Sequence, residues 1–213
     1  MIRKKRLEIL LSKLDPIPEP RLEWESYMLD AGSAAKIIYI ASFVYGDIRG
    51  KNVIDLGCGS GILAVGASIA GARWVVGVDV DKKSIEAAKR NASKVSADVD
   101  LVAGDISCVT GHFDTVLMNP PFGAWKRGAD VYFLEKALQI GDVIYSLHKG
   151  SESVRNFLSS KIPDIGGHID KVYSLTITIR RTFSFHRMRR YSVNADLYRI
   201  IRKASDARSK ANM

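Results

Sequence analysis

The chain has 213 residues, of which 46% are hydrophobic and 26% are charged. These proportions are ordinary for one globular domain, and they exclude a wholly disordered or fibrous protein. The net charge of +9 is concentrated at the two ends: residues 1–14 hold five Lys and Arg against one Glu, and residues 180–213 hold ten against two Asp. A nearly neutral body with two basic ends suggests a polyanionic partner such as nucleic acid, the alternative being two solvated faces.

The cysteines and the apolar segments indicate an intracellular protein. Because the two cysteines, Cys58 and Cys108, form no C-x-x-C pair, we expect neither a zinc site nor a redox motif. The apolar run behind the basic N-terminus, Ile9-Leu10-Leu11, is too short for a signal peptide. Without an apolar window of about eighteen residues we expect no membrane partner, and we expect a cytoplasmic location.

The predicted elements alternate between helices and strands. A short basic helix covers 3–14, and a second helix covers 30–45. Strands are predicted at 51–56, 74–79, 99–103, 113–118 and 143–147. Helices are predicted after the first strand, ending near residue 70, and over 82–95, 130–141 and 151–161. Two longer β segments, 168–182 and 191–201, follow without a helix between them. This order predicts an α/β fold: a Rossmann-like, doubly wound sheet of seven strands, mostly parallel, with an antiparallel C-terminal hairpin.

A glycine-rich turn follows the first predicted strand. Its glycines are Gly57, Gly59 and Gly61, and Asp55 stands two residues before them. A strand, a glycine turn and a helix place a ligand at the carboxyl edge of a parallel sheet, and the spacing differs from the dinucleotide fingerprint G-x-G-x-x-G. Asp79, at the end of the second strand, can accept hydrogen bonds from the ribose hydroxyls of a nucleoside. The alternative is a plain tight turn with helix-capping aspartates.

A second motif, Asn119-Pro120-Pro121-Phe122, follows the fourth strand and therefore lies at the same edge. The Asn119 oxygen and the Pro120 carbonyl can accept the two N–H groups of an exocyclic amine. The two prolines stiffen the position of that carbonyl, and Phe122 can stack on a base. Two acceptors below the ring plane favour a more pyramidal nitrogen, whose lone pair can attack a methyl donor. An isolated motif of this kind is also compatible with a Pro-Pro turn that buries its phenylalanine.

Basic and aromatic residues interleave between 180 and 191, in the loop of the predicted hairpin. This composition favours phosphate contacts combined with base stacking, although the two phenylalanines could instead face the sheet. The residues that we expect to contact RNA are Phe185, His186, Arg187, Arg189 and Arg190, with His148 and Lys149 at the rim of the pocket. No histidine has metal-type partners beside it, so we expect no metal site.

Together these residues resemble the class I S-adenosylmethionine-dependent methyltransferases that methylate amino groups. The NPPFG segment at 119–123 and Tyr145-Ser146-Leu147-His148-Lys149 are similar, more narrowly, to the archaeal and eukaryotic ribosomal RNA adenine-N6 methyltransferases. The resemblance spans roughly residues 22–203. It implies S-adenosylmethionine as the cofactor, with Asp55, the three glycines, Asp79 and Asn119 around it, and Asp105 at the adenine amino group.

The resemblance also implies a segment that closes the cofactor site. Glu25 and Tyr27 match the family there, whereas Ser26 stands where the family has Gln and Leu29 where it has Thr. Eukaryotic relatives use a small zinc-binding activator subunit, which makes such a subunit a possible partner. We accordingly divide the chain into a basic N-terminal extension, 1–20, and a class I methyltransferase domain with a basic C-terminal hairpin, 21–213.

The leading hypothesis is N6-methylation of an adenosine in RNA, with ribosomal RNA as the expected substrate. The same motifs serve DNA adenine methylation, and a related form methylates glutamine amides in proteins. A non-catalytic RNA-binding protein with the same fold is the alternative from another class, motivated by Ser26 and Leu29. A dinucleotide oxidoreductase is disfavoured by the glycine spacing.

Overall fold

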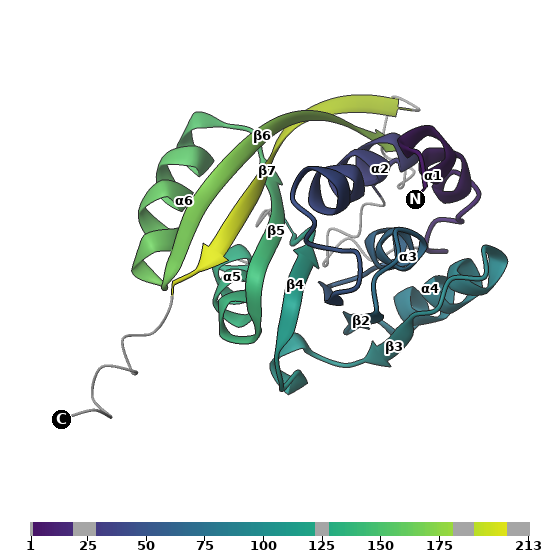
Figure 1. Ribbon diagram of the computed structural model, residues 1–213. Helices are drawn as coiled ribbons and strands as arrows, with labels where there is room; N and C mark the ends of the chain where they lie inside the picture. Colours follow the sequence, from purple (N-terminus) through teal and green to yellow (C-terminus); the bar gives the residue numbers. More distant parts are fainter. Residues whose placement is uncertain (1, 19–28, 122–127, 181–189, 204–213) are drawn as a thin grey trace.

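A computed structural model describes residues 2–18, 29–121, 128–180 and 190–203. Seven strands form one mixed sheet in the order β3-β2-β1-β4-β5-β7-β6 (Figure 1). Neighbours among β1 to β5 pair in parallel, and β7 pairs antiparallel with both β5 and β6. The strands are β1 (Asn52–Leu56), β2 (Trp74–Asp79), β3 (Asp100–Ala103), β4 (Phe113–Met118), β5 (Gly141–Lys149), β6 (Gly167–Arg180) and β7 (Arg190–Arg202). The predicted fold class is confirmed, including the antiparallel C-terminal pair.

The register brings the functional loops to one edge. Leu56, the last residue of β1, pairs with Val78 on one side and with Met118 on the other. Asp79 pairs in turn with Ala103 at the end of β3. The segments after these four parallel strands therefore meet at the carboxyl edge of the sheet, which is where ligands bind in doubly wound folds.

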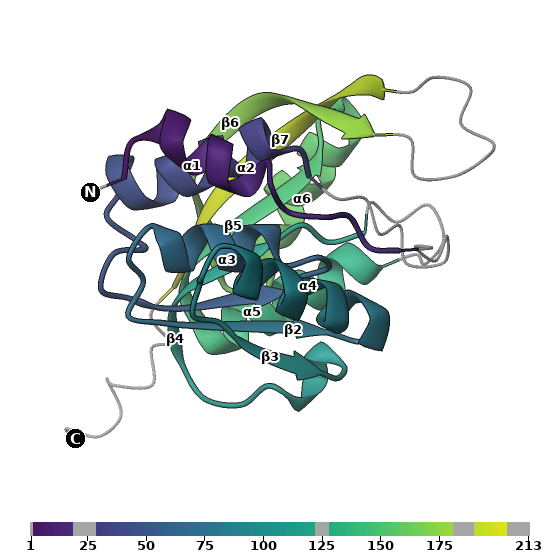
Figure 2. The same ribbon diagram turned by 90° about the vertical axis from the view of Figure 1, so that its right-hand side faces the viewer.

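Helices cover both faces of the sheet (Figures 1 and 2). On one face, α1 and α2 join the start of α3 in a core that contains Ile38, Val53 and Leu147. On the other face, α5 and α6 bury Leu134 and Leu158 against strand residues. The helical elements are α1 (Lys4–Leu11), α2 (Ala31–Tyr39), the π-helix η2 (Ile40–Val44), α3 (Ile62–Ile69), α4 (Lys82–Lys94), the 3-10 helix η3 (Ile106–Cys108), α5 (Ala129–Ile140) and α6 (Glu152–Asp164).

The N-terminal helix belongs to this core. Leu7 and Leu11 of α1 are 0% and 1% exposed, and they join the cluster that contains α2 and α3. Burying each leucine contributes roughly 1.5–3 kcal/mol, which is enough to anchor so short a helix. The basic segment over 1–20 therefore carries an anchored helix, and the domain boundary at residue 20 stays a prediction.

The observed elements differ from the predicted ones mainly at their ends. The helix predicted over 30–45 is divided, because the α-helix gives way to a π-helix at Ile40. Strand β5 begins at Gly141, directly after α5, where a Cβ atom would lie 2.3 Å from Val116 Cγ2. Glycine thus allows an immediate change from helix to strand. In the described part of the chain, no helix is long and apolar enough to cross a membrane.

Candidate active site

The glycine turn after β1 depends on positive backbone angles. Gly57, Gly59 and Gly61 have φ values of 68°, 54° and 82°, a region that L-residues with side chains adopt at a cost. A Cβ atom on Gly59 would have only Ile17 Cδ1 near it, at 3.7 Å, whereas one on Gly57 would lie 2.9 Å from the Phe133 ring. The turn therefore needs glycine for its shape, and at Gly59 the backbone is open to close approach by a ligand.

Asp55 caps the helix that follows this turn. Gly61 is the N-cap of α3 and has no side chain to offer, but Asp55 Oδ2 accepts a hydrogen bond of 3.0 Å from Ala64 N in the first turn. The Asp55 side chain is buried, and burial raises its pKa to about 7 despite the Ala64 N–H. Asp55 thus supports the cofactor turn from below, while its predicted role as a direct cofactor contact stays a prediction.

Asp79 links the same turn to α4. Its carboxylate accepts hydrogen bonds from Gly59 N at 2.8 Å and from Asp81 N at 2.9 Å, one on each oxygen. Burial raises the pKa of Asp79, and the two N–H groups oppose that shift. Each carboxylate oxygen has a second lone pair, so the two oxygens can still accept from two ribose hydroxyls.

Asp105 stands after β3 with two donors on one oxygen. Ser107 N donates to Asp105 Oδ1 at 2.8 Å, and the Tyr132 hydroxyl of α5 donates to the same atom at 2.5 Å. Tyr132 was not among the residues predicted from the sequence. The signal that could have found it is its position in the first turn of the helix that follows the NPPF segment.

Asn119 carries a buried acceptor without a partner. Its Oδ1 is buried and has no hydrogen-bond partner. Among the described residues, it is the one buried side-chain oxygen or nitrogen in this situation. Leaving such an atom unsatisfied costs roughly 1–3 kcal/mol, so native structures keep few of them and often at functional sites. Asn119 follows Met118 of β4, and Met118 pairs with Leu56, the last residue before the glycine turn. An incoming N–H group would satisfy this oxygen.

These features suit S-adenosylmethionine. The open backbone at Gly59 lets the cofactor approach closely, and Asp79 can accept hydrogen bonds from its ribose hydroxyls. The Asn119 oxygen, which has no partner, lies at the same edge of the sheet, where it can accept from the target amine. The described residues contain no group of His, Cys, Asp and Glu side chains arranged to hold a metal ion.

Comparisons with known proteins agree with this interpretation. The family model of the methyltransferase small domain matches residues 26–139, more than half of the chain. The chain belongs to this methyltransferase family. The rRNA N(6)-adenosine-methyltransferase METTL5 of Danio rerio is 31% identical over 93% of the chain and 98% of its own length, and the Drosophila melanogaster protein of that name is 32% identical over 93% and 96%.

A solved structure extends the match to three dimensions. The crystal structure of a candidate RNA methyltransferase, PH1948 from Pyrococcus horikoshii, has a TM-score of 0.88 at 36% identity, covering 96% of this chain and 100% of that one. The prediction of a class I S-adenosylmethionine-dependent methyltransferase, related to the ribosomal RNA adenine-N6 branch, is confirmed. So is the prediction of its cofactor.

Among the residues predicted to contact RNA, His148 lies elsewhere than at a pocket rim. Its side chain is 3% exposed, its Nε2 lies 2.6 Å from Ser146 Oγ, and its ring meets Tyr198 edge-on. Burial lowers its pKa to about 4, so the ring is neutral at physiological pH. A buried neutral imidazole cannot touch a phosphate in this conformation, and the placement of His148 at the rim was wrong. Lys149, the next residue, is exposed.

The remaining predictions fall largely outside the described residues. Arg190 opens β7, but its side chain is not described. Pro120 is buried and Pro121 is partly exposed, both directly after Asn119. The predicted site residues that lie outside the described ranges are Glu25, Tyr27, Phe122, Phe185, His186, Arg187 and Arg189.

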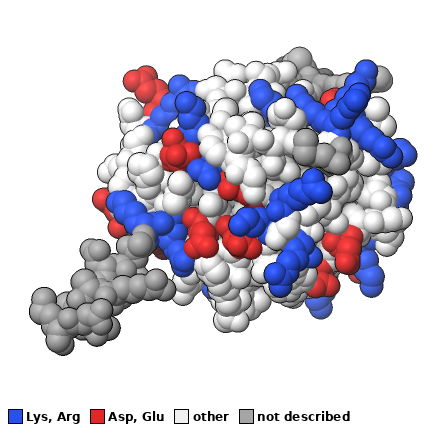
Figure 3. Space-filling model, in the orientation of Figure 1, with Lys and Arg blue, Asp and Glu red and all other residues white. Residues whose placement is uncertain are grey.

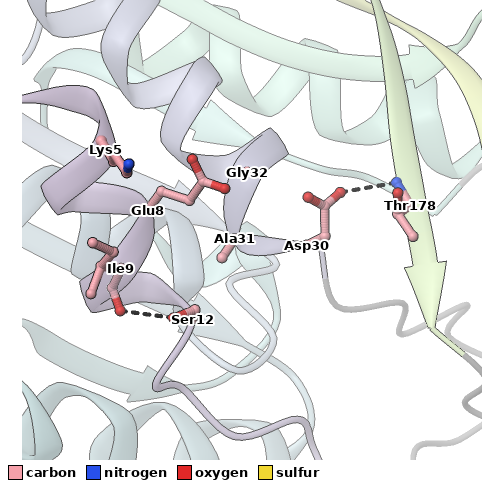
Figure 4. A pocket seen from close by; sticks show the side chains of 8 residues that line it. All are labelled: Lys5, Glu8, Ile9, Ser12, Asp30, Ala31, Gly32 and Thr178. Carbon is pink, nitrogen blue, oxygen red and sulfur yellow. Dashed lines mark hydrogen bonds between the residues drawn. The ribbon is translucent and has the colours of Figure 1, made fainter.

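A separate hollow of about 350 Å³ lies between α1, the start of α2 and β6 (Figure 4). Asp30 caps α2 through Ser33 N and also accepts a hydrogen bond of 2.9 Å from Thr178 N of β6. These bonds tie the antiparallel hairpin to the helical layer. The lining includes none of the catalytic or cofactor residues, so the hollow is distinct from the site at the carboxyl edge.

Proposed function

We propose that this protein transfers a methyl group from S-adenosylmethionine to N6 of an adenosine in RNA, and that the substrate is ribosomal RNA. The observation that carries the proposal is the buried, unpartnered Asn119 oxygen at the carboxyl edge, beside the glycine turn. Relatives of nearly full length that are named for this reaction on rRNA support the choice of substrate.

The residues of this chain act mainly by positioning. The cofactor supplies an electrophilic methyl group on its sulfonium. Asn119 Oδ1 accepts one N–H of the target amine, and the carbonyl of Pro120 accepts the other, which turns the nitrogen lone pair toward that methyl. With S-adenosylmethionine held there, the N–C bond would form as the S–C bond breaks, and the amine would then lose a proton to solvent. Holding the reacting atoms in line lowers the barrier without a strong base.

The N-terminal helix supports a nucleic-acid substrate. Lys4, Lys5 and Arg6 are exposed, and within the described ranges none of them forms an ion pair. In Figure 3, which has the orientation of Figure 1, Lys and Arg side chains gather where Figure 1 draws α1. Cations at a helix N-terminus oppose the helix dipole, so the arrangement lowers the stability of α1 unless an anion such as phosphate lies over it.

A protein partner is also part of the proposal. Strand β3 is the outer strand on the parallel side of the sheet, and Val102 on it is 43% exposed. Val80, after β2, is 53% exposed. An outer strand with exposed apolar side chains suits the small zinc-binding activator subunit that eukaryotic relatives use. We place the reaction in the cytoplasm, where ribosomal RNA and a reducing environment coincide.

The test is methyl transfer by purified protein, with and without an added activator subunit. Tritiated S-adenosylmethionine is offered with ribosomal RNA, with duplex DNA and with protein, and the labelled product is identified by nucleoside and amino-acid analysis. We expect N6-methyladenosine from RNA alone. Label in DNA, or in a glutamine side chain, would assign the site to one of the alternative substrates.

A variant pair connects this activity to the site. Asn119→Ala is expected to lower the rate by at least about 100-fold, with cofactor affinity within a few fold, because only the target amine loses its acceptor. Asn52→Ala, at the opposite end of β1, removes an amide without touching the site and is expected to keep the wild-type rate. Retained activity in Asn119→Ala would overturn the role of this residue. Cofactor binding without transfer to any substrate by the wild type would favour the non-catalytic alternative.

A further inference from the structure

The first turn of α5 rests on two of the loops that surround the cofactor. The Phe133 ring lies against Gly57, so closely that a Cβ atom there would be 2.9 Å from Phe133 Cε1. Tyr132 stands edge-on to this ring, with 6.3 Å between the ring centroids, and its hydroxyl reaches Asp105. One turn of helix therefore contacts both the glycine turn after β1 and the aspartate after β3.

A second contact fixes the same helix face to the Asp105 loop. Lys136 stands one turn after Tyr132, and its Nζ lies 3.3 Å from the carbonyl oxygen of Ser107. Residues four apart share a helix face, so Tyr132 and Lys136 approach η3 from the same side. Tyr132 contacts the N-cap of η3, Asp105, and Lys136 contacts its second residue, Ser107. The hydroxyl of Tyr132 is thus held at a defined place relative to Asp105.

The orientation of Asp105 matters because its side chain is exposed. An exposed aspartate samples several rotamers, and each one not suited to the ligand lowers the affinity. Two hydrogen bonds to Oδ1, from Ser107 N and from the Tyr132 hydroxyl, restrict both torsions of the side chain. The carboxylate also raises the pKa of Tyr132, so the phenol keeps its proton and remains a donor at physiological pH.

We propose that Tyr132 is a positioning residue for the cofactor, whose hydroxyl orients the Asp105 carboxylate toward the adenine amino group of S-adenosylmethionine. The proposal rests on the cofactor-binding part of the proposed function and is independent of the RNA substrate. Tyr132 thereby sets how strongly the site distinguishes a 6-aminopurine from a 6-oxopurine. Without its hydroxyl, the carboxylate is less restrained about its Cβ–Cγ bond.

The test compares two ligands that differ at purine position 6 and in the proton that N1 of the 6-oxopurine carries. Dissociation constants are measured by calorimetry for S-adenosylhomocysteine and for S-inosylhomocysteine, in which an oxo group replaces the amino group. Tyr132→Phe keeps the ring and removes the hydroxyl. We expect it to weaken the adenosyl ligand by about 3- to 10-fold, the loss typical of one hydrogen bond, and to change the inosyl ligand less than about twofold.

Two further variants keep the result specific. Tyr39→Phe is the matched control, because Tyr39 is 38% exposed, close to the 40% of Tyr132, and lies on α2 away from Asp105. It is expected to change neither affinity. Asp105→Ala is expected to abolish the preference for the adenosyl ligand, after which adding Tyr132→Phe has no further effect.

Either of two results would overturn the proposal: an unchanged affinity of Tyr132→Phe for the adenosyl ligand, or an equal weakening of both ligands. Equal weakening would mean that the hydroxyl only stabilises the loop. Both results are compatible with normal methyl transfer by the wild type, so they would leave the proposed function standing. Failure of the proposed function would appear in the transfer assay instead.

Discussion

Carboxylates stabilise both halves of the sheet, but they accept hydrogen bonds from different donors in each half. At the carboxyl edge of the parallel half, Asp55, Asp79 and Asp105 accept from backbone N–H groups. Across the antiparallel half, they accept from the guanidinium groups of Arg155 and Arg199. A backbone N–H leaves the negative charge in place, whereas a guanidinium neutralises it. Asp79 and Asp105 are therefore the carboxylates that we propose as acceptors for the hydroxyl and amino groups of the cofactor, while the antiparallel half uses its carboxylates to hold strands together.

In the antiparallel half, we expect the substitution of Arg199 to have the largest effect on stability. This side chain is 9% exposed, and it donates to Asp47, Asp170 and the Tyr145 hydroxyl. Arg199→Met should lower the free energy of unfolding by about 3–5 kcal/mol, because it leaves carboxylates in a poorly solvated site without their cation. Urea denaturation followed by circular dichroism measures the decrease.

Arg202 is the matched control, since it lies on the same strand and pairs with Asp142 in a partly exposed position. Arg202→Met should cost less than about 1 kcal/mol. Equal decreases in the two variants would show that burial does not distinguish the pairs.

In the parallel half, we expect the substitution of Asp79 to have the clearest effect, a loss of cofactor affinity. Asp79→Asn should raise the dissociation constant for S-adenosylhomocysteine about 10- to 100-fold, because a charged acceptor for ribose hydroxyls becomes a neutral amide. Calorimetric titration measures this constant. Asp100→Asn is the control, since this β3 carboxylate accepts from Trp74 Nε1 at the surface. If both variants bind the cofactor normally, Asp79 serves only to hold the turn and α4 together.

A pH series sharpens the comparison, because Asp55 is a buried carboxyl that has no cation beside it among the described residues. Its folded pKa of about 7 lies above its unfolded value, so the folded state binds the extra proton, and stability falls as pH rises from about 4 to about 7. Asp55→Asn keeps an acceptor for Ala64 N and should remove this fall, which amounts to at most about 1.4 kcal/mol per pH unit.

His148 contributes the opposite slope, since its folded pKa of about 4 lies below its unfolded value and stability decreases as pH falls through that range. The difference between wild type and Asp55→Asn isolates the aspartate. Parallel stability curves for the two proteins would contradict its raised pKa.

The smallest expected effect concerns RNA affinity. Replacing Lys4, Lys5 and Arg6 by Gln should weaken binding and reduce the slope of log K against log salt by about 0.7 to 0.9 for each phosphate that these cations neutralise. The control replaces three exposed cations of α4, Lys82, Lys89 and Arg90, with the same change in charge. An equal reduction in both variants would indicate a general field and not a contact surface on α1. Filter binding at several salt concentrations gives the slopes.

The parallel half of the fold was predictable from local pattern. Apolar runs such as 53–56 end at glycines or at Asp79, and these ends fix both the strands and the edge where they meet. The antiparallel pairing of β6 with β7 was predictable from the missing helix between them, whereas the place of β7 between β5 and β6 was not. The π-helix after Tyr39 left no mark in the sequence, because its apolar residues suit an α-helix equally well.

The site was predictable where residues carry motifs, and not where partners come from distant segments. Asn119 and Asp79 stand at strand ends, so their placement at one edge of the sheet follows from topology. Tyr132 meets Asp105 across 27 residues, and Arg199 meets Asp47 across 152. Such pairings depend on packing that no local pattern encodes. His148 was misplaced because β5 continues to Lys149, past the predicted end at residue 147, and pairs His148 with Asp196 of β7.

The central claim is tested most directly by nucleoside mass spectrometry of ribosomal RNA from cells that lack this protein. We predict that one N6-methyladenosine present in wild-type ribosomal RNA is missing from these cells. We further predict that the modification returns with the wild-type gene and not with Asn119→Ala. An unchanged set of modified adenosines in the deletion strain, or restoration by Asn119→Ala, would contradict the claim.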